Sequence, residues 1–71
     1  MPSKSLPHFY KGMHLKHTHP QSPIYTVTFI NTRHDPILYE CEDGYGKAYK
    51  FYEYELETVY QHDKRMGLLD R

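Results

Sequence analysis

An eight-residue run of β-branched and aromatic residues, Ile24–Asn31, constrains the fold more than any other part of this sequence. Side chains alternate across a strand, so Tyr25, Val27 and Phe29 are expected on one face, and the two threonines and Ile30 on the other. Residues of these types in this alternation predict a strand that is buried on at least one side.

Turn signals divide much of the remaining chain into runs of similar length. Clusters containing Gly, Pro, Asp or Asn mark turns at residues 20–23, 33–36 and 43–46. Further strands are expected over residues 13–17, 37–42 and 47–52, with Ile37, Tyr39 and Cys41 facing inward in the second of these. The Glu-rich residues 53–57 fit one turn of 3-10 helix, followed by a short closing strand at residues 59–60.

This pattern predicts an all-β fold of four to five short antiparallel strands. A barrel is the preferred form, because closure removes exposed strand edges. The chain has 71 residues, which fits a single domain. We expect a flexible leader over residues 1–8, the barrel over residues 9–60, and a C-terminal tail or short helix over residues 61–71.

Charge and cysteine content limit the function classes. Nine basic residues balance nine acidic ones, so the net charge is zero, which argues against a general binder of polyanions. Cys41 is the only cysteine, so no internal disulfide can form, and a reducing interior such as the cytoplasm is the expected compartment. We expect no membrane partner, since no stretch approaches the roughly 20 apolar residues that span a bilayer.

The chain resembles the small Src-homology-3-like (SH3-like) barrel proteins of bacteria and phages. The residues that carry the resemblance are Gly12-x-x-Leu15, Tyr25-x-Val27-x-x-Ile30, Tyr39-x-Cys41-x-x-Gly44, Phe51 and Glu55-Leu56-Glu57. The resemblance covers roughly residues 9–60 and implies a fold and a size, but no reaction. The sequence departs from the usual form at Met13, where such proteins often carry Asp, and in the loop around His19 and Pro20.

No catalytic motif is found, so we expect neither an enzyme nor a cofactor. Cys41 lies on the inward side of its strand, where a free cysteine is usually a small buried hydrophobe rather than a nucleophile. The leading hypothesis is a protein-interaction module, for example a phage or bacterial accessory protein that acts on a host factor. Exposed aromatic residues would supply the contact area. The expected contact residues are Tyr10, Tyr45, Tyr49, Tyr52 and Tyr54.

Two other functions stay open. In a nucleic-acid-binding barrel, Tyr45 and Tyr49 would stack on bases while basic side chains contact phosphates. The basic residues expected there are Lys16, Arg33, Lys47 and Lys50. In a metal or small-ligand protein, the site would be built from His14, His17 and His19, and a homo-oligomer would supply the cavity.

The six histidines are many for a chain of this length. We expect five of them to lie on strands, loops or the tail, in positions that are largely exposed to solvent. These five are His14, His17, His19, His34 and His62.

Overall fold

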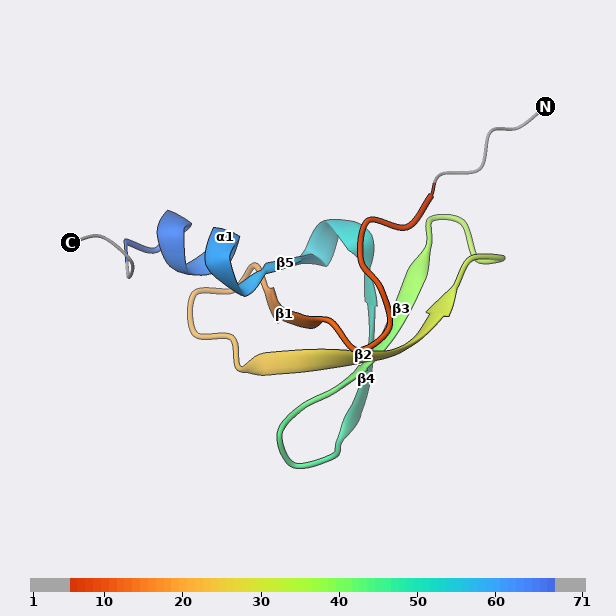
Figure 1. The fold of residues 1–71 in the computed structure, drawn as a ribbon, viewed down its shortest axis with the longest axis horizontal. Helices are drawn as coiled ribbons and strands as arrows, with labels where there is room; N and C mark the ends of the chain where they lie inside the picture. The colour runs from red at the N-terminus through yellow and green to blue at the C-terminus, as the bar shows by residue number, and fades with distance from the viewer. Residues whose placement is uncertain (1–5, 68–71) are drawn as a thin grey trace.

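The computed structural model describes residues 6–67, which form one curled antiparallel sheet and a short helix (Figure 1). The strands are β1 (His14–His17), β2 (Ile24–Asn31), β3 (Leu38–Glu42), β4 (Ala48–Tyr52) and β5 (Leu56–Thr58). A 3-10 turn, η1 (Glu53–Glu55), joins β4 to β5, and α1 (Val59–Arg65) follows β5 directly. The predicted all-β fold is confirmed in its short antiparallel strands and in the 3-10 turn before the last strand, and the structure also contains a helix that begins at Val59, two residues before the predicted tail or short helix.

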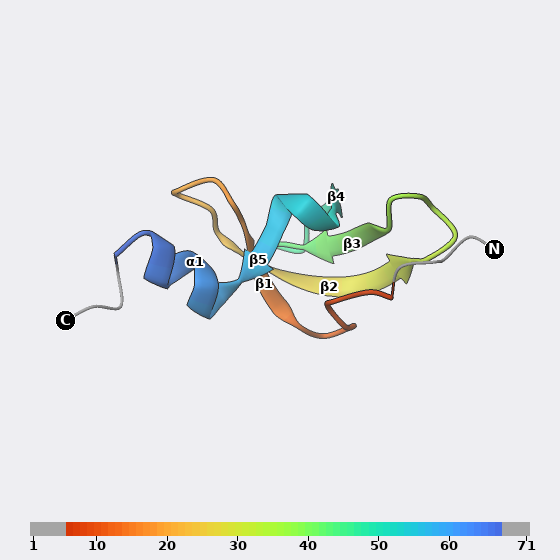
Figure 2. The same cartoon turned by 90° about the horizontal axis from the view of Figure 1, so that it is seen from above.

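The strands are arranged in the order β4-β3-β2-β1-β5, and every neighbouring pair is antiparallel. The view from above shows the chain leaving β4 through η1 and returning along β5 to β1 (Figure 2). In both views α1 and the loop between β2 and β3 lie at opposite ends of the molecule. The loop contains a cis peptide bond between Asp35 and Pro36.

The predicted closing strand at residues 59–60 is wrong. The last strand ends at Thr58, and Val59 begins α1. The reason is a capping box: the Thr58 hydroxyl accepts the Gln61 N–H at 3.0 Å, and the Gln61 side-chain oxygen accepts the Thr58 N–H at 3.1 Å. This reciprocal pair of hydrogen bonds satisfies two backbone N–H groups that the start of a helix leaves without partners. Residues 59–60 therefore form the first turn of α1 instead of a strand.

A bulge in β2 breaks the alternation expected there. The register with β3 shifts between Val27 and Phe29, so that Phe29 pairs with Glu40 and Ile30 pairs with Tyr39. The Thr28 hydroxyl donates to the Glu40 carbonyl at 3.1 Å across this irregularity. Phe29 is consequently 54% exposed instead of sharing the buried face of Tyr25 and Val27, while Ile30 packs against the core.

The core lies on the concave side of the sheet. Its buried members come from β1, β2, β3, β5 and the residue before β3, and are Leu15, Tyr25, Val27, Ile37, Tyr39, Cys41 and Leu56. The inward prediction for Ile37, Tyr39 and Cys41 is thus confirmed. Aromatic rings of β4 close over this core: Phe51 meets Tyr25 at 5.0 Å and His17 at 5.3 Å between ring centroids. Because β4 and β1 are not neighbours in the sheet, these contacts show that the sheet curls over itself.

Candidate protein-binding groove

An open groove of about 1160 Å³ runs along the end of the molecule that carries the β2–β3 loop. Three segments distant in sequence form it: residues 6–9, residues 32–37 of the loop, and Glu53 and Tyr54 of η1, together with Leu56 and Gln61. The walls mix apolar and polar side chains in about equal number, and the polar ones include charged groups of both signs. Leu6 and Tyr54 are 80% and 72% exposed, so large apolar groups face solvent along it.

Tyr39 connects the core to two of these segments. Its ring is fully buried and meets the Phe9 ring edge-on, with 5.4 Å between centroids. Its hydroxyl donates to Oε1 of Glu53 at 3.0 Å, and Oε2 of Glu53 contacts Nδ1 of His8. Burial raises the pKa of Tyr39, and the hydrogen bond to Glu53 raises it further, against the opposing effect of backbone hydrogen bonds from Phe9 and His8. One buried phenol thus holds both the N-terminal segment and η1.

Three aromatic rings stand in a row beside the groove, which we call the aromatic ladder: His34, Tyr52 and Tyr54. The Tyr52 and Tyr54 rings are stacked, 5.6 Å apart at 15°. His34 lies 5.8 Å from Tyr52 at a tilt of 43°. Stacked rings of this kind offer contact area at low entropy cost, because two torsion angles fix each side chain.

The position of the ladder depends on local backbone hydrogen bonds. Nδ1 of His34 donates to the Pro36 carbonyl at 2.9 Å. At the other end, the Glu55 side chain accepts the Tyr52 N–H at 2.8 Å, which fixes where β4 ends and η1 begins. The ladder is therefore built from two segments whose conformations are held independently.

The five tyrosines predicted as contact residues lie in different parts of the structure. Tyr52 and Tyr54 are in the ladder, whereas Tyr45 is 97% exposed in the turn between β3 and β4, at the opposite end of β4. Tyr49 points to the concave side, where its ring lies 5.1 Å from that of Tyr25 and its hydroxyl donates to Asp43. Tyr10 is 65% exposed in the segment before β1.

The four basic residues predicted to contact phosphates are also dispersed. Nζ of Lys16 donates to Oδ1 of Asp63 at 3.0 Å and is only 15% exposed. Arg33 lies in the β2–β3 loop, and Lys47 and Lys50 lie at the β3–β4 turn and on β4. Lys50 pairs across strands with Glu40, and Lys47 stands 5.5 Å over the Tyr49 ring. The four residues thus lie on four different parts of the chain, and Lys16 is engaged by Asp63.

Two of the three histidines proposed as metal ligands lie close together. Nδ1 of His17 accepts the His19 N–H at 3.1 Å, and Nδ1 of His19 accepts the Gln21 N–H at 3.1 Å. His14 points to the other face of β1, where Nδ1 lies 3.1 Å from the Thr26 hydroxyl. Over residues 6–67 no group of three or more His, Cys, Asp or Glu side chains is placed to hold a metal ion.

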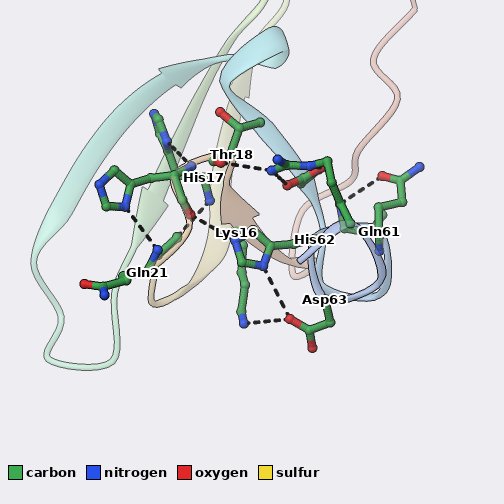
Figure 3. A network of polar contacts seen from close by, with 12 residues as sticks. Lys16, His17, Thr18, Gln21, Gln61, His62 and Asp63 are labelled. Atoms are coloured by element: carbon green, nitrogen blue, oxygen red, sulfur yellow. Dashed lines mark hydrogen bonds and ion pairs between the residues drawn. The ribbon is translucent and has the colours of Figure 1, made fainter. Parts of the chain in front are cut away.

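The expectation that His62 is exposed is wrong. His62 is 1% exposed and is the buried residue of α1. Its Nε2 donates to the His19 carbonyl at 2.9 Å, and its Nδ1 lies 3.4 Å from Oδ1 of Asp63 (Figure 3). A polar residue in a short C-terminal segment gives no sequence signal for burial, because the burial comes from a carbonyl 43 residues earlier in the chain.

Polar contacts dock α1 onto β1 and its following loop, as Figure 3 shows for the network around Lys16, Thr18 and His62. Arg65 donates to the Thr18 carbonyl at 2.9 Å and forms a two-pronged contact with the Glu57 carboxylate. These side chains are occupied in holding the helix, so the groove, to which α1 contributes only Gln61, is the better candidate site.

Cys41 is fully buried in the core and is a free thiol. Burial raises its pKa to about 11, so the reactive thiolate is scarce at neutral pH. The position fits the buried hydrophobe that the sequence predicts.

Comparisons with family models, with curated proteins and with solved structures found no match to this chain. Over the described residues 6–67, none of the helical structure is long and apolar enough to cross a membrane.

Sequence reasoning missed the N-terminal wall of the groove. Residues 6–8 fall in the predicted flexible leader, yet Leu6, Pro7 and His8 line the groove and His8 contacts Glu53. A usable signal was present, since apolar Leu6 and aromatic Phe9 flank Pro7 and His8 in a segment that is otherwise polar.

Proposed function

We propose that this protein is a non-enzymatic interaction module that binds an extended segment of a partner protein in the groove between residues 6–9, the β2–β3 loop and η1. The observation that carries the proposal is the groove itself, open to solvent and bordered by the exposed Leu6 and Tyr54 side chains. Aromatic side chains at a rigid site supply much of the energy of protein interfaces.

The aromatic ladder supports the choice of a protein partner. Tyr54 belongs both to the ladder and to the groove wall, so a bound segment contacts stacked rings on one side and apolar side chains on the other. The charged groups lining the groove are of both signs, including Arg33, Asp35 and Glu53, which matches a polypeptide better than a phosphate backbone. A host factor is one member of this partner class.

As the scaffold for this site we propose an SH3-like barrel. Five short antiparallel strands, a 3-10 turn before the last strand and the packing of β4 rings onto β1 and β2 support it. In this arrangement the loops at one end of the sheet carry the binding residues, while the strands carry the packing.

Affinity capture with matched surface variants tests the function. The bait is the full chain, either wild type, Tyr54→Ser or Tyr45→Ser. Both tyrosines are exposed, but only Tyr54 borders the groove. We expect a specific protein that is retained by wild type and by Tyr45→Ser and is lost with Tyr54→Ser, both before and after nuclease treatment.

The purified captured protein is then titrated against the same three baits. Loss of the partner only after nuclease treatment would point to nucleic acid, and equal binding by all three baits would place the contact away from the groove. Either result would contradict the proposed site.

A further inference from the structure

The N-terminal wall of the groove, residues 6–9, is packed on the rest of the molecule at Phe9 but exposed at Leu6. Residues 6–9 precede β1 and belong to no helix or strand. Phe9 is partly buried and packs against the core, whereas Leu6 is 80% exposed. The segment is therefore anchored through Phe9, while Leu6 and His8 are exposed.

Its two side-chain attachments differ in kind. Phe9 contacts the ring of Tyr39, which is fully buried, so separating them would expose apolar area. His8 contacts Glu53 with its own side chain 77% exposed, and contacts of that type contribute little to stability. The contact of His8 with Glu53 is thus the one that can open while the core stays closed.

We infer that residues 6–8 act as a strap on the groove, in which His8 leaves Glu53 when a partner segment enters and Phe9 stays packed on Tyr39. This inference rests on the groove being the partner site proposed above. It adds a means of control, because the strap and the partner compete for the same carboxylate.

The competition also specifies the chemistry of the partner. The Glu53 side chain is only 23% exposed, and one of its oxygens remains committed to Tyr39. When His8 leaves, Oε2 of this partially buried carboxylate loses its contact, and a donor from the partner segment can take that place. The partner segment therefore brings a cationic side chain to the place of His8, flanked by apolar residues as His8 is flanked by Pro7 and Phe9.

Amide hydrogen exchange on the full chain, with no partner present, tests the strap. The variant is His8→Ala, and the matched control is His14→Ala, an exposed histidine on β1. We expect exchange at residues 8–10 to be about two- to fivefold faster in His8→Ala, the range that loss of one exposed side-chain contact produces, and unchanged in β2 and β3. Glu53→Gln keeps an oxygen acceptor for Tyr39 but removes the charge, so the same local increase is expected.

Unchanged exchange at residues 8–10 in His8→Ala would overturn the strap. So would faster exchange throughout β2 and β3, because His8 would then support the whole sheet. These results do not depend on whether a partner exists, so the strap and the proposed function can fail separately.

The captured partner protein supplies the second readout. His8→Ala is expected to bind it about two- to fivefold more tightly, since the competing contact is gone, while Glu53→Gln binds more weakly than wild type. His8 and Glu53 variants that change affinity in the same direction would contradict the competition.

Discussion

The Tyr39 hydroxyl donates a 3.0 Å hydrogen bond to Oε1 of Glu53, and this bond joins the buried centre of the sheet to the 3-10 turn that borders the groove. Tyr39 is fully buried, and its ring also supports Phe9 of the N-terminal segment. The geometry of the groove is therefore set from within the core rather than by its exposed loops.

Tyr39→Phe should weaken the protein through this one bond. The variant keeps the ring and its packing but removes the donor to Oε1 of the partly buried Glu53 carboxylate, whose Oε2 still contacts His8. We expect a loss of about 0.5–1.5 kcal/mol in the free energy of unfolding, measured by urea denaturation. Tyr10→Phe, at a 65% exposed position, is the control and should unfold as wild type does. A Tyr39→Phe variant as stable as wild type would contradict this role.

Cys41 should be inert in the native protein. Its thiol is fully buried with a pKa raised to about 11, so at pH 8 only about 0.1% would be thiolate even if it were accessible. Labelling with a thiol-specific disulfide reagent at pH 8 should be slow in buffer and should accelerate in urea with the fraction unfolded. Rapid stoichiometric labelling in buffer would show that the core around β3 opens easily.

The bulge in β2 makes neighbouring residues respond very differently to substitution. Phe29→Ser should change stability by no more than about 0.5 kcal/mol, because the ring already faces solvent. Val27→Ala, at a 1% exposed position, should cost about 1.5 kcal/mol or more, since two buried methyl groups are lost at roughly 0.8 kcal/mol each. Urea denaturation of both variants decides the point, and a large loss with Phe29→Ser would mean that the ring is buried.

Strands were predictable wherever local chemistry decides the structure. The inward row of Ile37, Tyr39 and Cys41 follows from alternation alone. The same rule fails at Phe29, because one extra residue in β2 inverts the facing of every later side chain, and nothing in the run of strand-forming residues marks where that occurs. The sequence prediction did not place the start of α1 at Val59, although Thr58 followed three residues later by Gln61 is the pattern of a capping box.

The candidate site was predictable only in part. Tyr52 and Tyr54 were identified as contact residues by type, and they prove to be stacked on each other. Their association with His34, Glu53 and the N-terminal segment depends on contacts across the curled sheet. Such contacts join residues that lie far apart in the sequence, as His8 and Glu53 do across 45 positions of the chain. Neither the type of these residues nor their sequence neighbours indicates the contact, so residue type alone could not reveal it.

Asp63 should contribute to stability in a pH-dependent way. The hydrogen bond from Lys16 is the main cause that lowers its pKa, and His62 acts in the same direction. A carboxyl whose pKa is lower in the folded state stabilises that state above its ordinary pKa, near 3.8, and loses this contribution as the pH falls through the folded value.

Asp63→Asn should therefore unfold at lower urea concentration than wild type at pH 7, and the difference should shrink as the pH falls through the lowered pKa of folded Asp63. Glu42→Gln, at an exposed position on β3, is the control and should show little difference across this pH range. A difference for Asp63→Asn that is constant with pH would mean that packing, not the charge, holds α1.

The most direct measurement is the chemical-shift map of isotope-labelled protein titrated with the captured partner. The groove predicts that perturbed amides cluster in residues 6–10, in residues 32–37 and at Glu53–Glu55, and that the same titration into Tyr54→Ser leaves them nearly unchanged. Perturbations centred instead on the turn around Tyr45 would contradict the account, because this turn lies at the end of β4 opposite the aromatic ladder.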